Sequence, residues 1–84
     1  MSIEKEIVGI LEAVLNLNGR ASSLRRDSFL LGAVPELDSM AVLGVITTLE
    51  ERFGFTIHDD EIDGAVFATL GSLADFVQAK LAPD

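Results

Sequence analysis

The chain contains no cysteine and only one histidine, His58. The missing thiols exclude a disulfide framework, a thiolate zinc site and a cysteine nucleophile, and they leave the redox compartment undetermined. A metal cluster built on imidazoles is excluded as well, so we expect no metal site. Any thioester chemistry would need a sulfur atom that another molecule supplies.

Basic residues are scarce. Six Lys and Arg stand against fourteen Asp and Glu, which gives a formal net charge of −8. Such a surface repels nucleic acid, because nucleic-acid binding depends on neutralising phosphates with Lys and Arg. It favours encounter with basic patches on other proteins, although an acidic surface also serves solubility alone. We expect protein partners and no nucleic acid.

Long hydrophobic runs are also lacking. The longest falls far short of the roughly 20 apolar residues that a membrane span needs. Glu4, Lys5 and Glu6 stand where a signal peptide would have a basic and then an apolar stretch. Apolar residues still make up 49% of the 84 positions, enough for a small core. We expect a soluble, cytoplasmic monomer that folds as a single domain over residues 1–84.

Helical periodicity is clear near the N-terminus. Ser2 is a favoured cap type, and the Asn18-Gly19 turn signal predicts where this first helix ends. Its apolar stripe consists of Ile3, Ile7, Ile10, Leu11 and Val14. Residues 20–37 then lack periodicity and predict a long loop, which we expect Phe29, Leu30 and Leu31 to pin to the core.

A second helix is predicted over residues 39–53, between the cap residue Asp38 and Gly54. Its apolar stripe is assigned to Met40, Leu43, Ile46 or Val42, Leu49 and Phe53.

The C-terminal third predicts two further helices. Phe55 and Ile57 are expected to be extended, and Asp59 or Asp60 then caps a short third helix that includes Ile62. The last helix begins at Thr69 or Ser72, and its apolar face shows Leu73, Phe76, Val77 and Leu81. Four phenylalanines are assigned to the core ahead of Phe55: Phe29, Phe53, Phe67 and Phe76. The predicted fold is an all-α, four-helix bundle with a long first loop and a short third helix.

Ser39 lies at the start of the second predicted helix. Free backbone N–H groups and the positive end of the helix dipole gather there, so a phosphate ester on its hydroxyl would be stabilised. Asp38 could support such a site by helping to hold a divalent cation or by orienting a modifying enzyme. Taken alone, the pair Asp38-Ser39 is equally an ordinary helix cap.

The sequence around this serine resembles that of acyl carrier proteins. Asp38-Ser39-Met40 matches the family's Asp-Ser-Leu motif, with Met in place of Leu. Three later segments look like the end of the family's second helix, the entry into its third and its final helix: Leu49 to Gly54, Phe55 to Glu61, and Thr69 to Val77. The similarity covers roughly residues 3 to 81, and this ordered set is far more specific than the three-residue motif.

The resemblance implies a mechanism. A phosphopantetheinyl transferase would use coenzyme A and a magnesium ion to attach 4′-phosphopantetheine to the Ser39 hydroxyl as a phosphodiester. The thiol at the end of this arm supplies the missing sulfur. Acyl-loading and acyl-transferring enzymes, with basic or apolar docking patches, would place cargo on it as thioesters and remove it. The carrier performs no chemistry itself, so no catalytic residue is expected.

Four positions depart from the family's pattern. Leu37 stands where the family often has Gly, and Arg52 interrupts an acidic cluster. Ala41 and Gly44 stand where carriers of fatty acid synthesis usually have acidic residues. These departures put a role in general fatty acid synthesis in doubt. We expect a fatty acid, polyketide or dedicated lipid-type pathway. Docking is then expected to be apolar with acidic edges, through Glu36, Met40, Glu50 and Glu51. A peptidyl or aminoacyl carrier is the alternative within this class, and an unmodified acidic helical adaptor is the alternative outside it.

Two other sequence patterns, one for calcium binding and one for nucleophilic catalysis, are incomplete. The acidic segment from Asp59 to Gly64 imitates the start of an EF-hand loop, but the twelfth position, which needs a bidentate Glu, is Leu70. A nucleophilic pair of Ser39 and His58 would need proximity and an orienting acid, and it lacks any recognisable nucleophile elbow. We expect His58 to lie on the surface.

Overall fold

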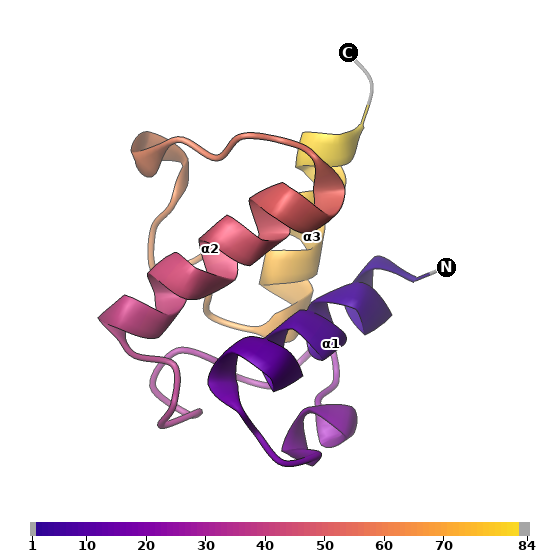
Figure 1. Ribbon diagram of the computed structural model, residues 1–84, viewed down its shortest axis with the longest axis vertical. Coiled ribbons are helices and arrows are strands. Elements are labelled where there is room, and N and C mark those ends of the chain that lie inside the picture. The colour runs from indigo at the N-terminus through magenta and orange to yellow at the C-terminus, as the bar shows by residue number, and fades with distance from the viewer. Residues whose placement is uncertain (1, 83–84) are drawn as a thin grey trace.

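Three α-helices form the framework of the protein: α1 (Ile3–Leu15), α2 (Ser39–Phe53) and α3 (Leu70–Leu81). Two 3₁₀ turns interrupt the connections between them: η1 (Arg20–Ser23) and η2 (Asp59–Glu61). The computed structural model describes residues 2–82. α1 packs against both other helices, and Figure 1 shows α2 crossing in front of α3. No strand forms in the described range, which confirms the predicted all-α class.

The helix termini follow local sequence signals. The Oγ of Ser2 accepts the N–H of Lys5 at the start of α1, and Gly54 takes the left-handed conformation, with φ 76°, after α2. Thr69 and Ser72 cap each other reciprocally, so Thr69 is the cap and α3 begins at Leu70. Asp38 caps the start of α2, so with Gly54 at the other end the predicted bounds of α2 agree with the structure.

The core lies where α1, α2 and α3 meet. α1 contributes Ile7, Ile10 and Leu11 to it, as its periodicity predicts, while Ile3 and Val14 pack at its edge. Burying one such side chain stabilises the fold by about 1.5–3 kcal/mol. The largest fully buried side chains are Phe67, Ile7, Ile10, Leu11, Leu30, Leu49, Leu70, Leu73, Val45 and Val77.

The predicted apolar face of α2 is partly wrong. Val45 and Leu49 are fully buried, whereas Met40 is 75% exposed and Leu43 is 59% exposed. Apolar residues occupy most positions in the first half of α2, so periodicity alone does not select a face. Packing against α1 selects it, because a Cβ at Gly44 would lie 3.4 Å from the Val14 Cγ1.

The connection between α1 and α2 differs from its prediction in two respects. α1 ends at Leu15, ahead of the expected Asn18-Gly19 turn, because Asn16 already adopts a left-handed conformation with φ 54°. Of the apolar trio expected to pin the loop, only Leu30 is buried. Phe29 is 68% exposed and Leu31 is 44% exposed, so the assignment of Phe29 to the core was wrong.

The segment docks on the start of α3 around Leu30. The N–H groups of Leu30 and Leu31 donate to the carbonyl oxygens of Ala68 and Phe67, and the Leu30 carbonyl oxygen accepts the N–H groups of Ala33 and Val34 in a turn. Leu30 is thereby held against the core, while Phe29 and Leu31 lie at the surface.

The predicted short third helix is not an α-helix. Its segment forms only the 3₁₀ turn η2 (Asp59–Glu61), and Ile62 lies outside it. The Glu61 carboxylate accepts the N–H of His58, as in a capping box, and so favours the single turn. Asp63 then accepts the N–H groups of Ala65 and Val66, which competes with continuation of a helix. Within the described range, every helix is too short or too polar to cross a bilayer.

Candidate functional site

Ser39 is the first residue of α2, and its side chain is exposed. The preceding residue, Asp38, caps the helix: its Oδ1 accepts the N–H of Ala41 at 2.8 Å. Among residues 2–82, no protein acceptor meets the N–H groups of Ser39 and Met40. The two free donors and the positive end of the 15-residue helix dipole suit an anionic group on the Ser39 hydroxyl.

An apolar pocket of about 280 Å³ adjoins this serine. The pocket lies between the start of α2, the first loop and the segment after η2. Its lining residues are Leu31, Ser39, Val42, Ile62, Asp63, Gly64 and Phe67. A hydrocarbon chain attached near Ser39 would find mostly apolar neighbours there.

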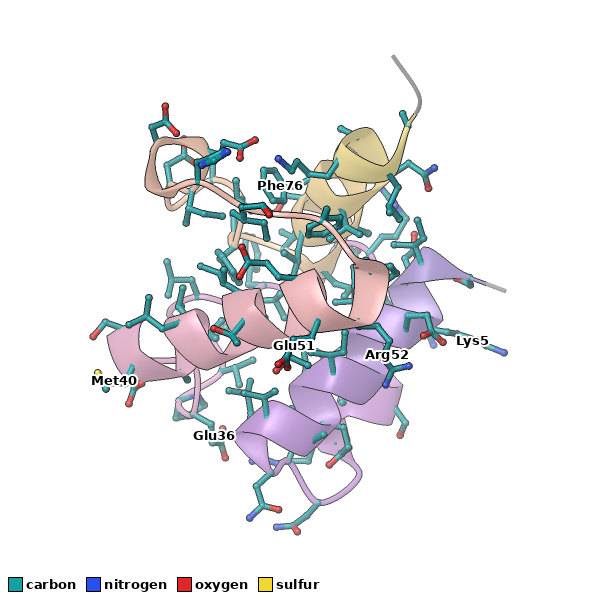
Figure 2. All side chains as sticks on the ribbon, turned by 45° about the horizontal axis from the view of Figure 1, so that its top comes forward. Lys5, Glu36, Met40, Glu51, Arg52 and Phe76 are labelled. Carbon is teal, nitrogen blue, oxygen red and sulfur yellow. The ribbon has the colours of Figure 1, made fainter. Side chains whose placement is uncertain are left out.

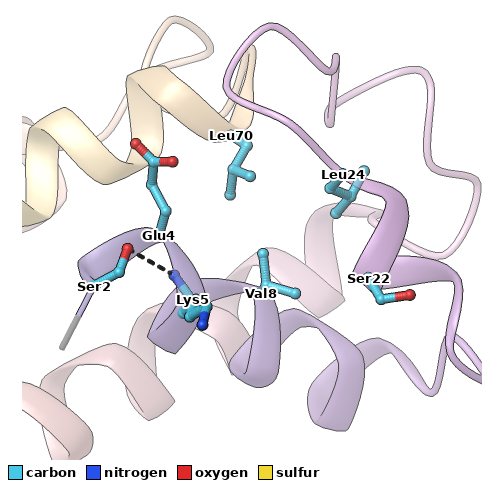
Figure 3. Close-up of a pocket in the computed structure, with 7 residues that line it drawn as sticks. All are labelled: Ser2, Glu4, Lys5, Val8, Ser22, Leu24 and Leu70. Atoms are coloured by element: carbon cyan, nitrogen blue, oxygen red, sulfur yellow. Dashed lines mark hydrogen bonds between the residues drawn. The ribbon is translucent and has the colours of Figure 1, made fainter.

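A larger cavity of about 470 Å³ lies elsewhere, between the starts of α1 and α3 and η1 (Figure 3). Figure 3 shows its seven lining residues, none of which belongs to α2: Ser2, Glu4, Lys5, Val8, Ser22, Leu24 and Leu70. Because Ser39 is not among its lining residues, the smaller pocket is the one that belongs to the candidate site.

The outward face of α2 is apolar close to Ser39. Met40 and Leu43 project into solvent there, and Figure 2 shows Met40 at the tip of the helix. Ala41 packs against the core, and Gly44 faces α1. The two positions that lack the expected acids therefore lie toward the protein interior, and they contribute little to the exposed face.

Two of the acidic residues predicted to contact partners, Glu36 and Glu50, bind other groups of this chain. Glu36 pairs with Arg20, and this guanidinium, with a backbone N–H of Glu36, holds the pKa of the Glu36 carboxyl below its ordinary value. Glu50 is half-buried, and its Oε2 accepts the N–H of Ile57 at 2.7 Å. Glu51 is exposed.

The predicted site residues form two groups. Glu36, Asp38, Ser39 and Met40 gather at the start of α2. Glu50 and Glu51 lie near its other end, about 18 Å away at 1.5 Å per residue. Sequence analysis did not connect Arg20, Ile62 or Phe67 with Ser39, because each comes to this end of α2 from a segment more than fifteen residues away.

The comparisons with known proteins agree with this geometry. Residues 5–77 match the family described as "Phosphopantetheine attachment site". Among solved structures, the chain is similar to the holo acyl carrier protein of Nitrosomonas europaea, determined by solution NMR. That match has 54% sequence identity and a TM-score of 0.90, and it covers 96% of this chain and 98% of the other. The search of curated proteins gave no match.

The family match spans most of the chain and includes Ser39. The structural match extends over nearly all of both chains at high identity. Membership implies a phosphopantetheinyl transferase and acyl-handling enzymes as partners. The chain therefore belongs to the acyl carrier protein family, with covalently attached 4′-phosphopantetheine as its cofactor.

Proposed function

We propose that Ser39 is the residue that carries the 4′-phosphopantetheine arm. One observation carries the assignment: of the serines in residues 2–82, only Ser39 has a hydroxyl that makes no hydrogen bond within the protein. The Oγ atoms of the other five are bound to backbone groups, at Ser2, Ser22, Ser23, Ser28 and Ser72. The Ser39 hydroxyl is thus free to react.

The surroundings of Ser39 fit both ends of such an arm. The free N–H groups at the start of α2 would hold the phosphodiester, and the adjoining apolar pocket would accept hydrocarbon cargo. In the attachment step the Ser39 oxygen forms a bond to phosphorus and gives up its proton. The pyrophosphate bond of the donor, coenzyme A, breaks, and adenosine 3′,5′-bisphosphate is released together with the proton. Once attached, the arm supplies the thiol that the cysteine-free chain lacks.

Asp38 supports this step in the proposal. Its Oδ1 is engaged as the helix cap, so it fixes the backbone that presents Ser39. The carboxylate is also exposed and negatively charged, so it can help to hold the divalent cation of the transferase reaction or orient the transferase.

Partner enzymes are proposed to dock on the outward face of α2, with Glu36, Met40, Glu50 and Glu51 as contacts. The exposed Met40 beside Ser39 supports apolar docking, and the exposed Glu51 supplies an acidic edge. Because Glu36 and Glu50 are tied to Arg20 and Ile57, we expect them to contribute less than Glu51. The pathway is proposed to be a fatty acid, polyketide or dedicated lipid-type pathway, and an aminoacyl or peptidyl cargo is the alternative.

The remaining features complete the proposal. Residues 1–84 act as one carrier domain that works in the cytoplasm and catalyses nothing itself. The η2 turn, with the residues that follow it, takes the position of the short third helix in a four-helix carrier bundle. This assignment rests on its contribution of Ile62 to the pocket beside Ser39.

Intact mass spectrometry tests the central assignment. The purified protein is incubated with coenzyme A, magnesium and a transferase of broad specificity. The wild type is expected to gain the mass of one phosphopantetheine, and Ser39→Ala is expected to gain none. Ser22→Ala is the matched control, because it removes another exposed serine hydroxyl and leaves Ser39 in place.

The variants also separate the alternatives. Modification that persists in Ser39→Ala would move the attachment to another residue. A folded wild type that gains no mass would favour the unmodified adaptor.

A further inference from the structure

The loop that leads to Ser39 is fixed at three consecutive residues. Glu36 is ion-paired with Arg20, Leu37 is only 4% exposed, and Asp38 caps α2. Figure 2 shows Glu36 close to the Met40 end of α2, on the side of α1. The position of the reactive hydroxyl therefore depends on anchors that precede it directly in the chain.

Arg20, the partner of Glu36, makes a second hydrogen bond that fixes its guanidinium. The Nε of Arg20 donates to the carbonyl oxygen of Leu17 at 3.0 Å, and the Leu17 side chain is 2% exposed. A second nitrogen of the same guanidinium, Nη2, binds the Glu36 carboxylate. Arg20 thus connects the end of α1 with the loop before α2, across sixteen residues of sequence.

Glu36 depends on Arg20 as its side-chain partner. Its Oε1 has no hydrogen-bond partner among the described residues, although 33% of the side chain is exposed. Its Oε2 binds the Arg20 guanidinium, and this contact, with the backbone N–H of Glu36, outweighs desolvation, because the pKa of the carboxyl is lowered. The ion pair therefore favours the charged carboxylate in this position, three residues before the reactive serine.

We propose that the Arg20–Glu36 ion pair positions the loop before α2 so that Ser39 is presented correctly to the enzyme that modifies it. Both are positioning residues, because neither touches the reacting atoms. This inference rests on the proposed attachment at Ser39.

We expect loss of the ion pair to slow modification only moderately, because two other contacts of the loop remain. Without the ion pair, Leu37 and Asp38 still hold the loop, but Glu36 and the turn before it gain freedom that must be removed when the transferase binds. Exposed ion pairs have small coupling energies, so kcat/KM for modification is expected to fall about twofold to fivefold. The loss should appear mainly in KM, because the hydroxyl itself is unchanged.

Single and double variants test the pair. Arg20→Gln, Glu36→Gln and the double variant are modified under identical conditions, and the initial rates are measured by intact mass. Glu6→Gln is the matched control: it breaks the Arg52–Glu6 pair, whose side chains are 55% and 25% exposed against 56% and 33% for Arg20 and Glu36. That pair lies at the other end of α2. Melting temperatures are recorded for all four variants.

The expected result is a similar fall in kcat/KM for both single variants, with the double variant no worse than either. Glu6→Gln should modify at the wild-type rate with a comparable melting temperature. The two single variants change the net charge in opposite directions, so electrostatic steering of the transferase would move their rates in opposite directions.

Other outcomes overturn the inference. If only Glu36→Gln is slow, Glu36 acts as a docking contact alone, and the ion pair with Arg20 positions nothing. If neither single variant is slow, or if Glu6→Gln slows modification equally, the pair contributes no more than general stability. A wild type that is not modified at all would instead remove the proposed function, so the two failures are distinguishable.

Discussion

Gly71, the second residue of α3, is the position where an added methyl group should do most harm. Its Cβ would lie 2.8 Å from the backbone oxygen of Arg26 and 3.3 Å from the Arg26 Nη2. The same oxygen accepts the N–H of Gly71 at 2.8 Å. The first loop is therefore docked on the start of α3 at a distance that only glycine allows, and Gly71→Ala must push the two segments apart.

The cost has three parts. Overpacking of this kind costs about 1–3 kcal/mol, and weakening the Gly71–Arg26 hydrogen bond costs about 1 kcal/mol. Replacing glycine in a helix returns at most about 1 kcal/mol. The net loss is about 2 kcal/mol, which lowers the melting temperature of a domain of this size by roughly 8–16 °C.

Thermal unfolding followed by circular dichroism measures the effect. Gly9→Ala is the control, because Gly9 lies within α1 and a Cβ there meets nothing within 4 Å. It should raise the melting temperature by a few degrees, since alanine is the better helix former by about 0.5–1 kcal/mol. If Gly71→Ala melts at or above the wild-type temperature, the described docking of the first loop on α3 is wrong.

Two further predictions concern docking and pH. Replacing Met40 and Leu43 by Ala should lower kcat/KM for the transferase severalfold with little change in stability, because both side chains are exposed on α2. The control Leu81→Ala, on α3, should be modified at the wild-type rate. If the α2 variant were modified as fast as this control, apolar docking on α2 would be refuted. The His58 backbone N–H and the Lys80 ammonium lower the pKa of Glu61, so its carboxylate stabilises the fold above the unfolded-state pKa and this contribution is lost as the pH falls below about 5. Denaturation midpoints should show Glu61→Gln weaker than the wild type at neutral pH, with the difference closing in acid; a constant difference would contradict this.

The position of Ser39 was predictable because its signals are local. A helix cap needs only a few neighbouring residues, and both Asp38 and Gly54 act as their residue types predict. The same holds for Thr69 and Ser72 at the start of α3. The Asp38-Ser39-Met40 motif, read with the later segments, then indicated the family.

The surroundings of Ser39 were not predictable, because they depend on contacts between distant segments. Ile62 and Phe67 line the pocket next to it, and Arg20 holds the loop before it. No periodicity or motif connects such residues. Ser39 itself was found from the sequence. Only the structure shows that, among residues 2–82, its hydroxyl makes no hydrogen bond while those of the other serines do.

By itself, the sequence determined the helical class, the start and end of α2 and the candidate serine, since caps and periodicity act within a few residues. Only the tertiary structure decided which face of α2 is buried, which acidic residues remain exposed and what adjoins Ser39. The physical reason is that α2 is apolar on most sides of its first half. Its orientation is therefore set by the close approach of α1 at Gly44 and by the burial of Val45 and Leu49.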